Sequence, residues 1–166
     1  MTFYNIEERH FIEDIGLFFE QMGLPRMGGR ILGVLLISVP PVQSLTELSE
    51  SLQASKSAIS SATRLLLEAD LIERVPGPVA RQEYYRFRQG GWMMFMRQRL
   101  DVMKALHQIT ERGLELMKQK QPESNDRLQE AHDLFSFFET EYESWMHDYE
   151  THQAKLKTDR GNPVNG

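Results

Sequence analysis

Apolar residues recur near the N-terminus at steps of four, three and four, which places them on one face of a helix: Phe11, Ile15, Phe18 and Met22. We expect this helix over about residues 6–22, ended by the segment from Gly23 to Pro25. A second helix, over about 26–38, is apolar on most sides, which is typical of a buried helix. Pro40-Pro41 ends it, because proline cannot donate the next helical hydrogen bond.

Two short helices are expected next, each with a polar cap. Ser44-Leu45-Thr46-Glu47 matches a capping box, in which the serine and glutamate side chains satisfy each other's backbone N–H groups. This helix ends near Leu52, and Ser55 is a natural cap for the following helix, which reaches about Ala69. Strands over 71–75 and 82–88 flank a loop rich in proline and glycine, which disfavour ladder pairing.

The C-terminal half predicts two long helices. Gly90-Gly91 separates the hairpin from a helix over about 92–119, and Pro122 breaks it. A last helix over about 127–156 carries a three-four apolar repeat: Leu128, Ala131, Phe135, Phe138, Tyr142, Trp145, Tyr149, His152 and Leu156. The polar tail from Lys157 onward is expected to be disordered.

Composition excludes several classes of function. The 166 residues contain no cysteine, which removes disulfides, thiol catalysis and thiolate metal sites. The longest apolar stretch, Ile31 to Val39, is about half of the roughly 20 residues that a membrane span needs. Acidic residues at the N-terminus replace the basic start of a secretory signal. We therefore expect a cytoplasmic protein without a membrane partner.

Charge is distributed unevenly along the chain. The net charge is −5, but residues 56–104 hold nine Lys and Arg against five Asp and Glu. The segments on both sides are acidic. A basic middle between acidic ends is typical of a DNA-contacting module with separate association helices.

The fourth expected helix, over 55–69, has two chemically different faces. At 100° per residue, Ile59, Ala62 and Leu66 gather on one side. The other side presents small hydroxyl side chains and charged residues: Ser57, Ser60, Ser61, Arg64 and Glu68. Small residues let a helix approach DNA closely, while serine and arginine can contact phosphates or base edges. A merely solvated surface is the alternative interpretation of this face.

The order of elements favours the DNA-binding interpretation. A capped helix, a tight turn, a second capped helix and a basic hairpin follow one another as a winged helix-turn-helix requires. Arg81 lies at the tip of that hairpin, where it could enter a narrow minor groove. The residues predicted to contact DNA are Thr46, Ser55, Lys56, Ser57, Ser60, Ser61, Arg64, Arg74, Arg81 and Arg86.

Residues 45–88 resemble the DNA-binding core of the MarR superfamily of transcription regulators. In particular they resemble its GbsR-type branch, named for the glycine betaine synthesis regulator. Three stretches carry the resemblance: 25–36 (PRMGGRILGVLL), 55–60 (SKSAIS) and 81–85 (RQEYY). The wing tip Pro78-Val79-Ala80 is less polar than that of the family.

The resemblance implies a mainly α protein with a winged helix-turn-helix domain, a two-stranded wing and terminal helices that form a dimerisation region. The expected organisation is an N-terminal dimerisation helix (1–25), the DNA-binding domain (26–89), the long dimerisation helices (90–156) and the tail (157–166). The implied function is a homodimeric regulator, expected to be a repressor, on a pseudo-palindromic operator in double-stranded DNA. Control of choline or glycine betaine genes is implied as well.

The aromatic repeat of the last helix predicts the contact between protomers. Its residues are Leu128, Phe135, Phe138, Tyr142, Trp145 and Tyr149, although the stripe could also pack within one subunit. A small-molecule effector is a further hypothesis, because aromatic cages bind quaternary ammonium groups such as choline. Its pocket would include Phe11, Phe18, Trp92 and Phe95, although aromatic residues at helical spacing are usually core.

Enzymatic chemistry is not indicated. Gly28 and Gly29 resemble a phosphate loop only superficially, because the following Lys-Ser/Thr is missing; close helix packing explains them better. Asp148 and His152 stand one turn apart, but an exposed pair is commoner than a metal site. We expect no enzyme activity, cofactor or metal. A winged-helix interaction adaptor and a small-molecule binding protein without DNA binding remain alternatives.

Overall fold

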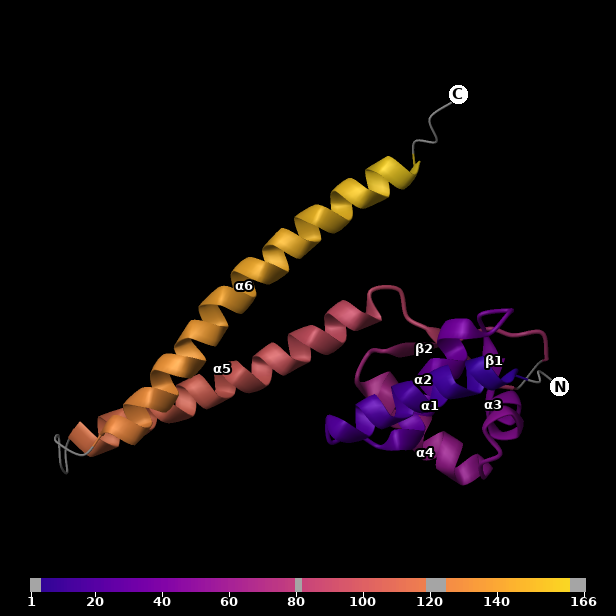
Figure 1. The fold of residues 1–166 in the computed structure, drawn as a ribbon, viewed down its shortest axis with the longest axis horizontal. Coiled ribbons are helices and arrows are strands. Elements are labelled where there is room, and N and C mark those ends of the chain that lie inside the picture. The colour runs from indigo at the N-terminus through magenta and orange to yellow at the C-terminus, as the bar shows by residue number, and fades with distance from the viewer. Residues whose placement is uncertain (1–3, 80–81, 119–124, 162–166) are drawn as a thin grey trace. The chain divides into compact units, whose positions relative to one another are not determined.

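The computed structural model describes residues 4–79, 82–118 and 125–161. Its internal contacts divide the chain into two units, Met1–Met96 and Arg97–Gly166. The elements are α1 (Ile6–Gln21), α2 (Arg26–Ile37), β1 (Gln43–Ser44), α3 (Leu45–Leu52), α4 (Lys56–Glu68), β2 (Ile72–Val75), β3 (Tyr84–Phe87), α5 (Gly91–Lys118) and α6 (Asp126–Gly161) (Figure 1).

The small sheet of the first unit is antiparallel, with the strand order β1-β3-β2. The two predicted wing strands are confirmed as β2 and β3, and Ile72 pairs with Phe87 and Val75 with Tyr84. The sequence did not predict β1, in which Gln43 and Ser44 pair with Tyr85 and Tyr84. Two residues are too few to show a period of two, so only the tertiary structure reveals this strand.

Helices α1 and α2 cross in close backbone contact. A Cβ atom added at Gly29 would lie 2.5 Å from the carbonyl oxygen of Ile15 and 2.8 Å from the Cα of Gly16. One added at Gly33 would lie 3.0 Å from the Cα of Ile12. Gly29 and Gly33 therefore allow α1 and α2 to touch, which is the close helix packing that the sequence suggested for Gly29.

The buried face of α1 differs from its apolar stripe. Ile12, Gly16 and Phe19 are buried, whereas Phe11 and Phe18 are 37% and 49% exposed. The apolar stripe therefore lies beside the buried face of α1, because the close crossing with α2 places Gly16 at the centre of that buried face. Phe19 joins a core made mainly of α2, α3, α4 and sheet residues: Ile31, Leu32, Leu35, Leu48, Ile59, Leu66, Leu71, Ile72 and Tyr85.

In the second unit, α6 runs antiparallel to α5. Arg97 pairs with Glu150 and Lys104 with Glu143, so positions that rise along α5 meet positions that fall along α6. The less exposed positions of α5 follow a three-four repeat: Leu100, Met103, His107, Thr110, Leu114 and Met117. Those of α6 do the same: Leu128, His132, Phe135, Glu139, Tyr142, Met146, Tyr149 and Gln153.

The end of α6 differs from the expected one. Residues 157–161, expected in a disordered tail, are helical, because adding one residue to an existing helix costs far less than starting one. Within the described ranges, none of the helices combines the length and the hydropathy that crossing a membrane requires.

Candidate DNA-binding interface

The helix-turn-helix is built from local hydrogen bonds that the sequence predicted. The Ser44 hydroxyl accepts from the N–H of Glu47 at 3.2 Å, and the Glu47 carboxylate accepts from the N–H of Ser44 at 2.6 Å. Gln53 adopts a left-handed conformation with φ 50° and ends α3. Ser55 then caps α4 by accepting from the N–H of Ala58 at 3.2 Å. Both caps are confirmed, and they orient α4 relative to α3.

The two faces of α4 are those expected, with one exception. Ile59, Ala62 and Leu66 are buried. Four residues of the predicted outer face are exposed: Ser57, Ser61, Arg64 and Glu68. Ser60 is only half-buried, at the margin of the face, where its carbonyl accepts a hydrogen bond from the Thr63 hydroxyl at 3.1 Å. Thr46 of α3 is also half-buried.

Two apolar residues extend this outer face and were not predicted. Ala58 is exposed, and the Leu65 side chain is 45% exposed. At 100° per residue they lie within one turn of Ser61 on the same side of α4. Methyl groups on a helix that enters the major groove can contact the C5-methyl group of thymine. The helical spacing that placed Ser61 on the outer face could have found them.

Lys56 and Arg64 are the free cations of α4. Both are exposed, and within the described part of the chain neither forms a hydrogen bond or an ion pair. Lys56 is the first residue of the helix, where the backbone N–H groups and the helix dipole already favour an anion. Their positive charge is therefore available to a phosphate or a guanine edge.

The wing arginines are held by acidic neighbours. Arg86 Nε lies 2.7 Å from Glu73 Oε1 on the paired strand, and Arg74 Nε lies 3.3 Å from Glu83 Oε1. Their side chains are 52% and 61% exposed, so each pair is weak and can exchange for a phosphate. Arg81, predicted at the wing tip, lies outside the described residues.

Tyr85 anchors the wing to the core. It is 2% exposed, and its hydroxyl donates to Glu83 Oε2 at 2.6 Å. Burial, followed by this hydrogen bond, raises the pKa of the Tyr85 hydroxyl above its usual value of 10.0. The protonated tyrosine therefore helps fix the carboxylate that also faces Arg74.

Comparison with known proteins identifies the family. Residues 90–152 match the family model described as "MmpR5-like MarR family transcriptional regulator". The "HTH-type transcriptional regulator MmpR5" of Mycobacterium tuberculosis is 35% identical over 129 residues, which cover 78% of each chain. This chain belongs to the MarR family of transcriptional regulators.

Two further comparisons agree. The "HTH-type transcriptional repressor OpcR" of Bacillus subtilis is 27% identical over 150 residues, covering 86% of this chain and 78% of its own. A crystal structure described as "a transcriptional regulator" superposes with a TM-score of 0.73 at 32% identity, covering 87% of this chain and 99% of its own. The MarR-family chain is therefore a DNA-binding regulator and not an enzyme, with the predicted winged-helix fold. The GbsR-type branch stays a prediction.

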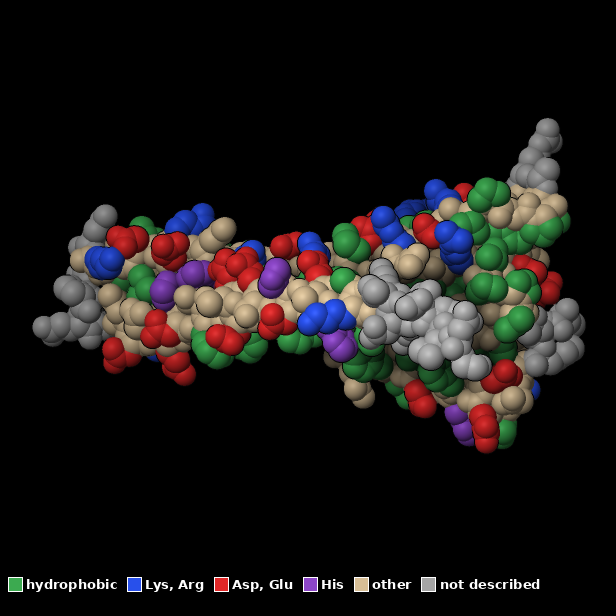
Figure 2. Space-filling model, turned by 90° about the horizontal axis from the view of Figure 1, so that it is seen from above, with side chains coloured by type: hydrophobic (Ala, Val, Ile, Leu, Met, Phe, Trp, Pro, Cys, Tyr) green, Lys and Arg blue, Asp and Glu red, His purple; other side chains and the backbone are tan. Residues whose placement is uncertain are grey.

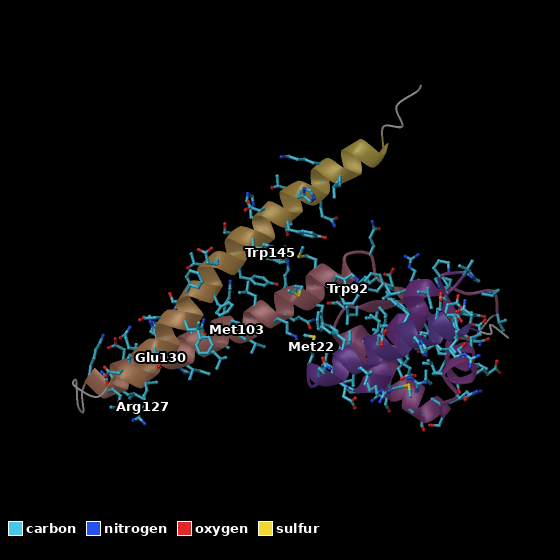
Figure 3. All side chains as sticks on the ribbon, viewed as in Figure 1. Met22, Trp92, Met103, Arg127, Glu130 and Trp145 are labelled. Carbon is cyan, nitrogen blue, oxygen red and sulfur yellow. The ribbon has the colours of Figure 1, made fainter. Side chains whose placement is uncertain are left out.

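The residues predicted for the dimer contact divide between two faces of α6. Leu128, Phe135, Tyr142 and Tyr149 are half-buried in the repeat that faces α5 within the same chain. Phe138 and Trp145, seven residues apart, are 49% and 48% exposed. Trp145, labelled on α6 in Figure 3, stacks on Tyr149 with ring centroids 5.9 Å apart. The positions that face α5 and the exposed aromatic positions alternate along the sequence. The sequence therefore predicted one stripe where the structure has two.

The residues of the predicted effector pocket differ in burial, and two of them meet: the rings of Trp92 and Phe95 lie edge to face with centroids 6.5 Å apart. Phe95 is 5% exposed, and its ring stacks on Phe19 with centroids 5.9 Å apart. Its face is thus covered by the core, as the alternative interpretation of the aromatic residues anticipated. Phe11, Phe18 and Trp92 are 37–49% exposed.

Proposed function

We propose that this MarR-family protein is a homodimeric repressor that inserts α4 into the major groove of a pseudo-palindromic operator. The observation that carries the proposal is the outer face of α4, where exposed Ser57 and Ser61 lie beside the unpaired Arg64. The serines leave room for the base edges, and the guanidinium can bind guanine O6 and N7 together.

Residues around this face supply the sequence-independent contacts. Lys56 and the N-terminus of α4 face a phosphate, while Arg74 and Arg86 of the wing exchange their carboxylates for the DNA backbone. On the face that Figure 2 shows, acidic side chains are frequent along the two long helices, in line with the acidic balance of residues 105–166. DNA contact is therefore assigned to the first unit.

Exposed apolar residues on the second unit support the homodimer. On α5 they recur every seven residues, as Val102, Ile109 and Leu116, and they are 51%, 53% and 63% exposed. Phe138 and Trp145 repeat this spacing on α6. Apolar stripes of this kind on a soluble helix pair favour burial against another helix. A second copy offers the same spacing and places two α4 helices on one DNA duplex.

The similarity to the transcriptional repressor OpcR, which extends over 78% of that protein, supports the repressor role. Genomic fragments selected by the purified protein would define the operator and its neighbouring genes. Osmoprotectant genes beside those fragments would support the GbsR-type resemblance. Expression of a reporter gene placed behind a selected fragment should fall when the protein is produced. Expression that rises instead would show that the protein is an activator.

The test of DNA recognition compares two exposed arginines by fluorescence anisotropy on the selected operator. Arg64→Ala should weaken binding by about 5- to 150-fold, the loss of roughly 1–3 kcal/mol of base contact. Arg127→Ala, in the first turn of α6 (Figure 3), is the control and should leave the affinity unchanged. Equal affinities for the wild type and both variants would contradict the proposal.

The test of the homodimer is light scattering on the double variant Phe138→Glu/Trp145→Glu. Two charges in an apolar contact should yield a monomer, because each must be desolvated on association. Ser144→Glu adds a charge at an exposed polar position of the same helix and is the control. A double variant with the mass of the wild-type dimer would place the dimer contact elsewhere.

A further inference from the structure

A polar layer interrupts the apolar contact between α5 and α6. His107 of α5 and His132 and Glu139 of α6 occupy positions of the three-four repeats that elsewhere hold mostly leucine, methionine or aromatic residues. Their side chains are 23%, 24% and 29% exposed. Such groups need partners when they are half-buried, so their contacts are informative.

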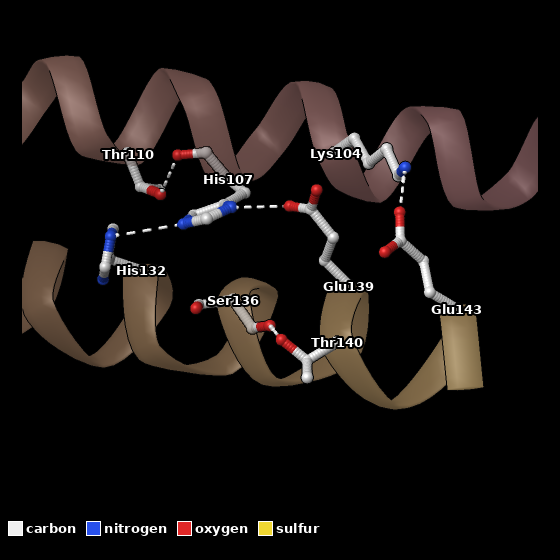
Figure 4. Close-up of polar contacts among 8 residues, drawn as sticks. All are labelled: Lys104, His107, Thr110, His132, Ser136, Glu139, Thr140 and Glu143. Atoms are coloured by element: carbon white, nitrogen blue, oxygen red, sulfur yellow. Dashed lines mark hydrogen bonds and ion pairs between the residues drawn. The ribbon is translucent and has the colours of Figure 1, made fainter. Parts of the chain in front are cut away.

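The two imidazole rings face each other with their Nε2 atoms. These atoms are 3.3 Å apart, while the ring centroids are 4.8 Å apart, so the Nε2 corners are turned inward (Figure 4). On the far side of each ring stands a carboxylate. His107 Nδ1 lies 2.7 Å from Glu139 Oε2, and His132 Nδ1 lies 3.3 Å from Asp133 Oδ1.

Hydrogen-bond accounting leaves this array one hydrogen short. It contains three contacts, and each requires one N–H between its two atoms. Two neutral imidazoles carry only two N–H groups. If both Nδ1 atoms donate to their carboxylates, two lone pairs meet at the Nε2 atoms. A cation between the two Nε2 atoms, either a proton or a metal ion, would complete the array.

We propose that His107 and His132 form a binding site for Zn²⁺ or a similar divalent transition-metal ion. Tetrahedral Zn²⁺ holds histidine nitrogens at about 2.0–2.1 Å, which puts the two nitrogens roughly 3.3–3.4 Å apart. The Nε2 separation already has this value. Histidine ligands of zinc commonly donate their other N–H to a carboxylate, which orients the ring; Glu139 and Asp133 are placed to do so.

The groove beside His107 gives an ion and water access to this ring. It runs between α5 and α6 and is lined by Gln108, Glu111, Ser136, Glu139, Thr140 and Glu143. Its carboxylates attract a cation. The described residues contain no cluster of three or more metal-binding side chains, so water completes the coordination. The ion joins α5 to α6, and its affinity is lower than that of a four-residue structural site.

The test is calorimetric titration of the full-length protein with zinc chloride. The wild type should bind one Zn²⁺ per chain, and zinc should raise its Tm, because the ion binds the folded chain. His132→Gln should lose both effects. His152→Gln removes an exposed histidine of the same helix, outside the array, and should keep both. If the wild type released or absorbed no heat with zinc, the two histidines would share only a proton, and the proposal would be overturned. Full zinc binding by His132→Gln would also overturn it.

A second measurement needs no substitution, so it tests the site even if the His132→Gln variant does not fold. In the wild-type protein labelled with ¹⁵N, zinc should shift the Nε2 resonances of His107 and His132. Shifts confined to His10, His147 or His152 would also overturn the proposal. The inference does not depend on the proposed DNA recognition, because neither measurement includes DNA.

Discussion

Gly28 and Gly29 are adjacent in α2, yet alanine should have opposite effects at the two positions. At Gly28 an added Cβ would lie 3.8 Å from the nearest atom, a methyl carbon of Leu66, which is ordinary contact. At Gly29 it would lie 2.5 Å from the Ile15 carbonyl oxygen, 2.8 Å from the Gly16 Cα and 2.9 Å from the Phe19 Cβ. The first two are backbone atoms, so α1 and α2 must separate.

The magnitudes follow from two terms. Alanine gains about 1 kcal/mol over glycine inside a helix, and this gain applies at both positions. Overpacking of a tight core costs typically about 1–3 kcal/mol, and a backbone clash belongs at the upper end. Gly28→Ala should therefore raise the free energy of unfolding by about 1 kcal/mol. Gly29→Ala should lower it by about 2 kcal/mol.

Urea unfolding followed by circular dichroism measures both effects, with all proteins at one concentration because dimerisation adds to stability. The midpoint of Gly28→Ala should lie above that of the wild type, and the midpoint of Gly29→Ala below it. Equal midpoints for the two variants would refute the close crossing of α1 and α2. A more stable Gly29→Ala would refute it as well.

Three further predictions concern the DNA-binding unit. Ser44→Ala removes the capping box of α3 and should cost about 1 kcal/mol in urea unfolding; an unchanged midpoint would show that the cap is dispensable. Tyr85 has a raised pKa when folded, so its share of stability is present below pH 10 and is lost as the pH rises above it. Unfolding of Tyr85→Phe should therefore depend less on alkaline pH, and a curve parallel to that of the wild type would contradict the shift. Glu73→Gln releases Arg86 from its ion pair and should tighten operator binding a few-fold; weaker binding would mean that the carboxylate positions the arginine.

Local interactions account for what the sequence predicted well. The caps Ser44 and Ser55 act on backbone N–H groups three residues away, and their partners are visible in the sequence. The buried face of α4 follows from helical periodicity alone. These features position the candidate DNA-binding face, so its serines and Arg64 were within reach of the sequence.

Long-range pairing accounts for what the sequence missed. Glu73 lies opposite Arg86 because of the register between β2 and β3, which the long loop leaves undetermined in the sequence. The inner repeat of α6 was hidden because His132 and Glu139 occupy core positions through contact with His107. A search for apolar residues at helical spacing overlooks such positions. A polar residue enters a helix–helix contact only when a partner on another element satisfies its hydrogen bonds, and the sequence does not show that partner.

The salt dependence of operator binding tests the role of α4 most directly. Each phosphate that a cation neutralises contributes about −0.9 to the slope of log K against log salt concentration. In a dimer, the double variant Lys56→Ala/Arg64→Ala should bind the operator more weakly than the wild type. Its slope should also become shallower by about 2, because the loss of Lys56 removes one phosphate contact from each protomer. A slope and an affinity identical to those of the wild type would show that the outer face of α4 does not contact DNA.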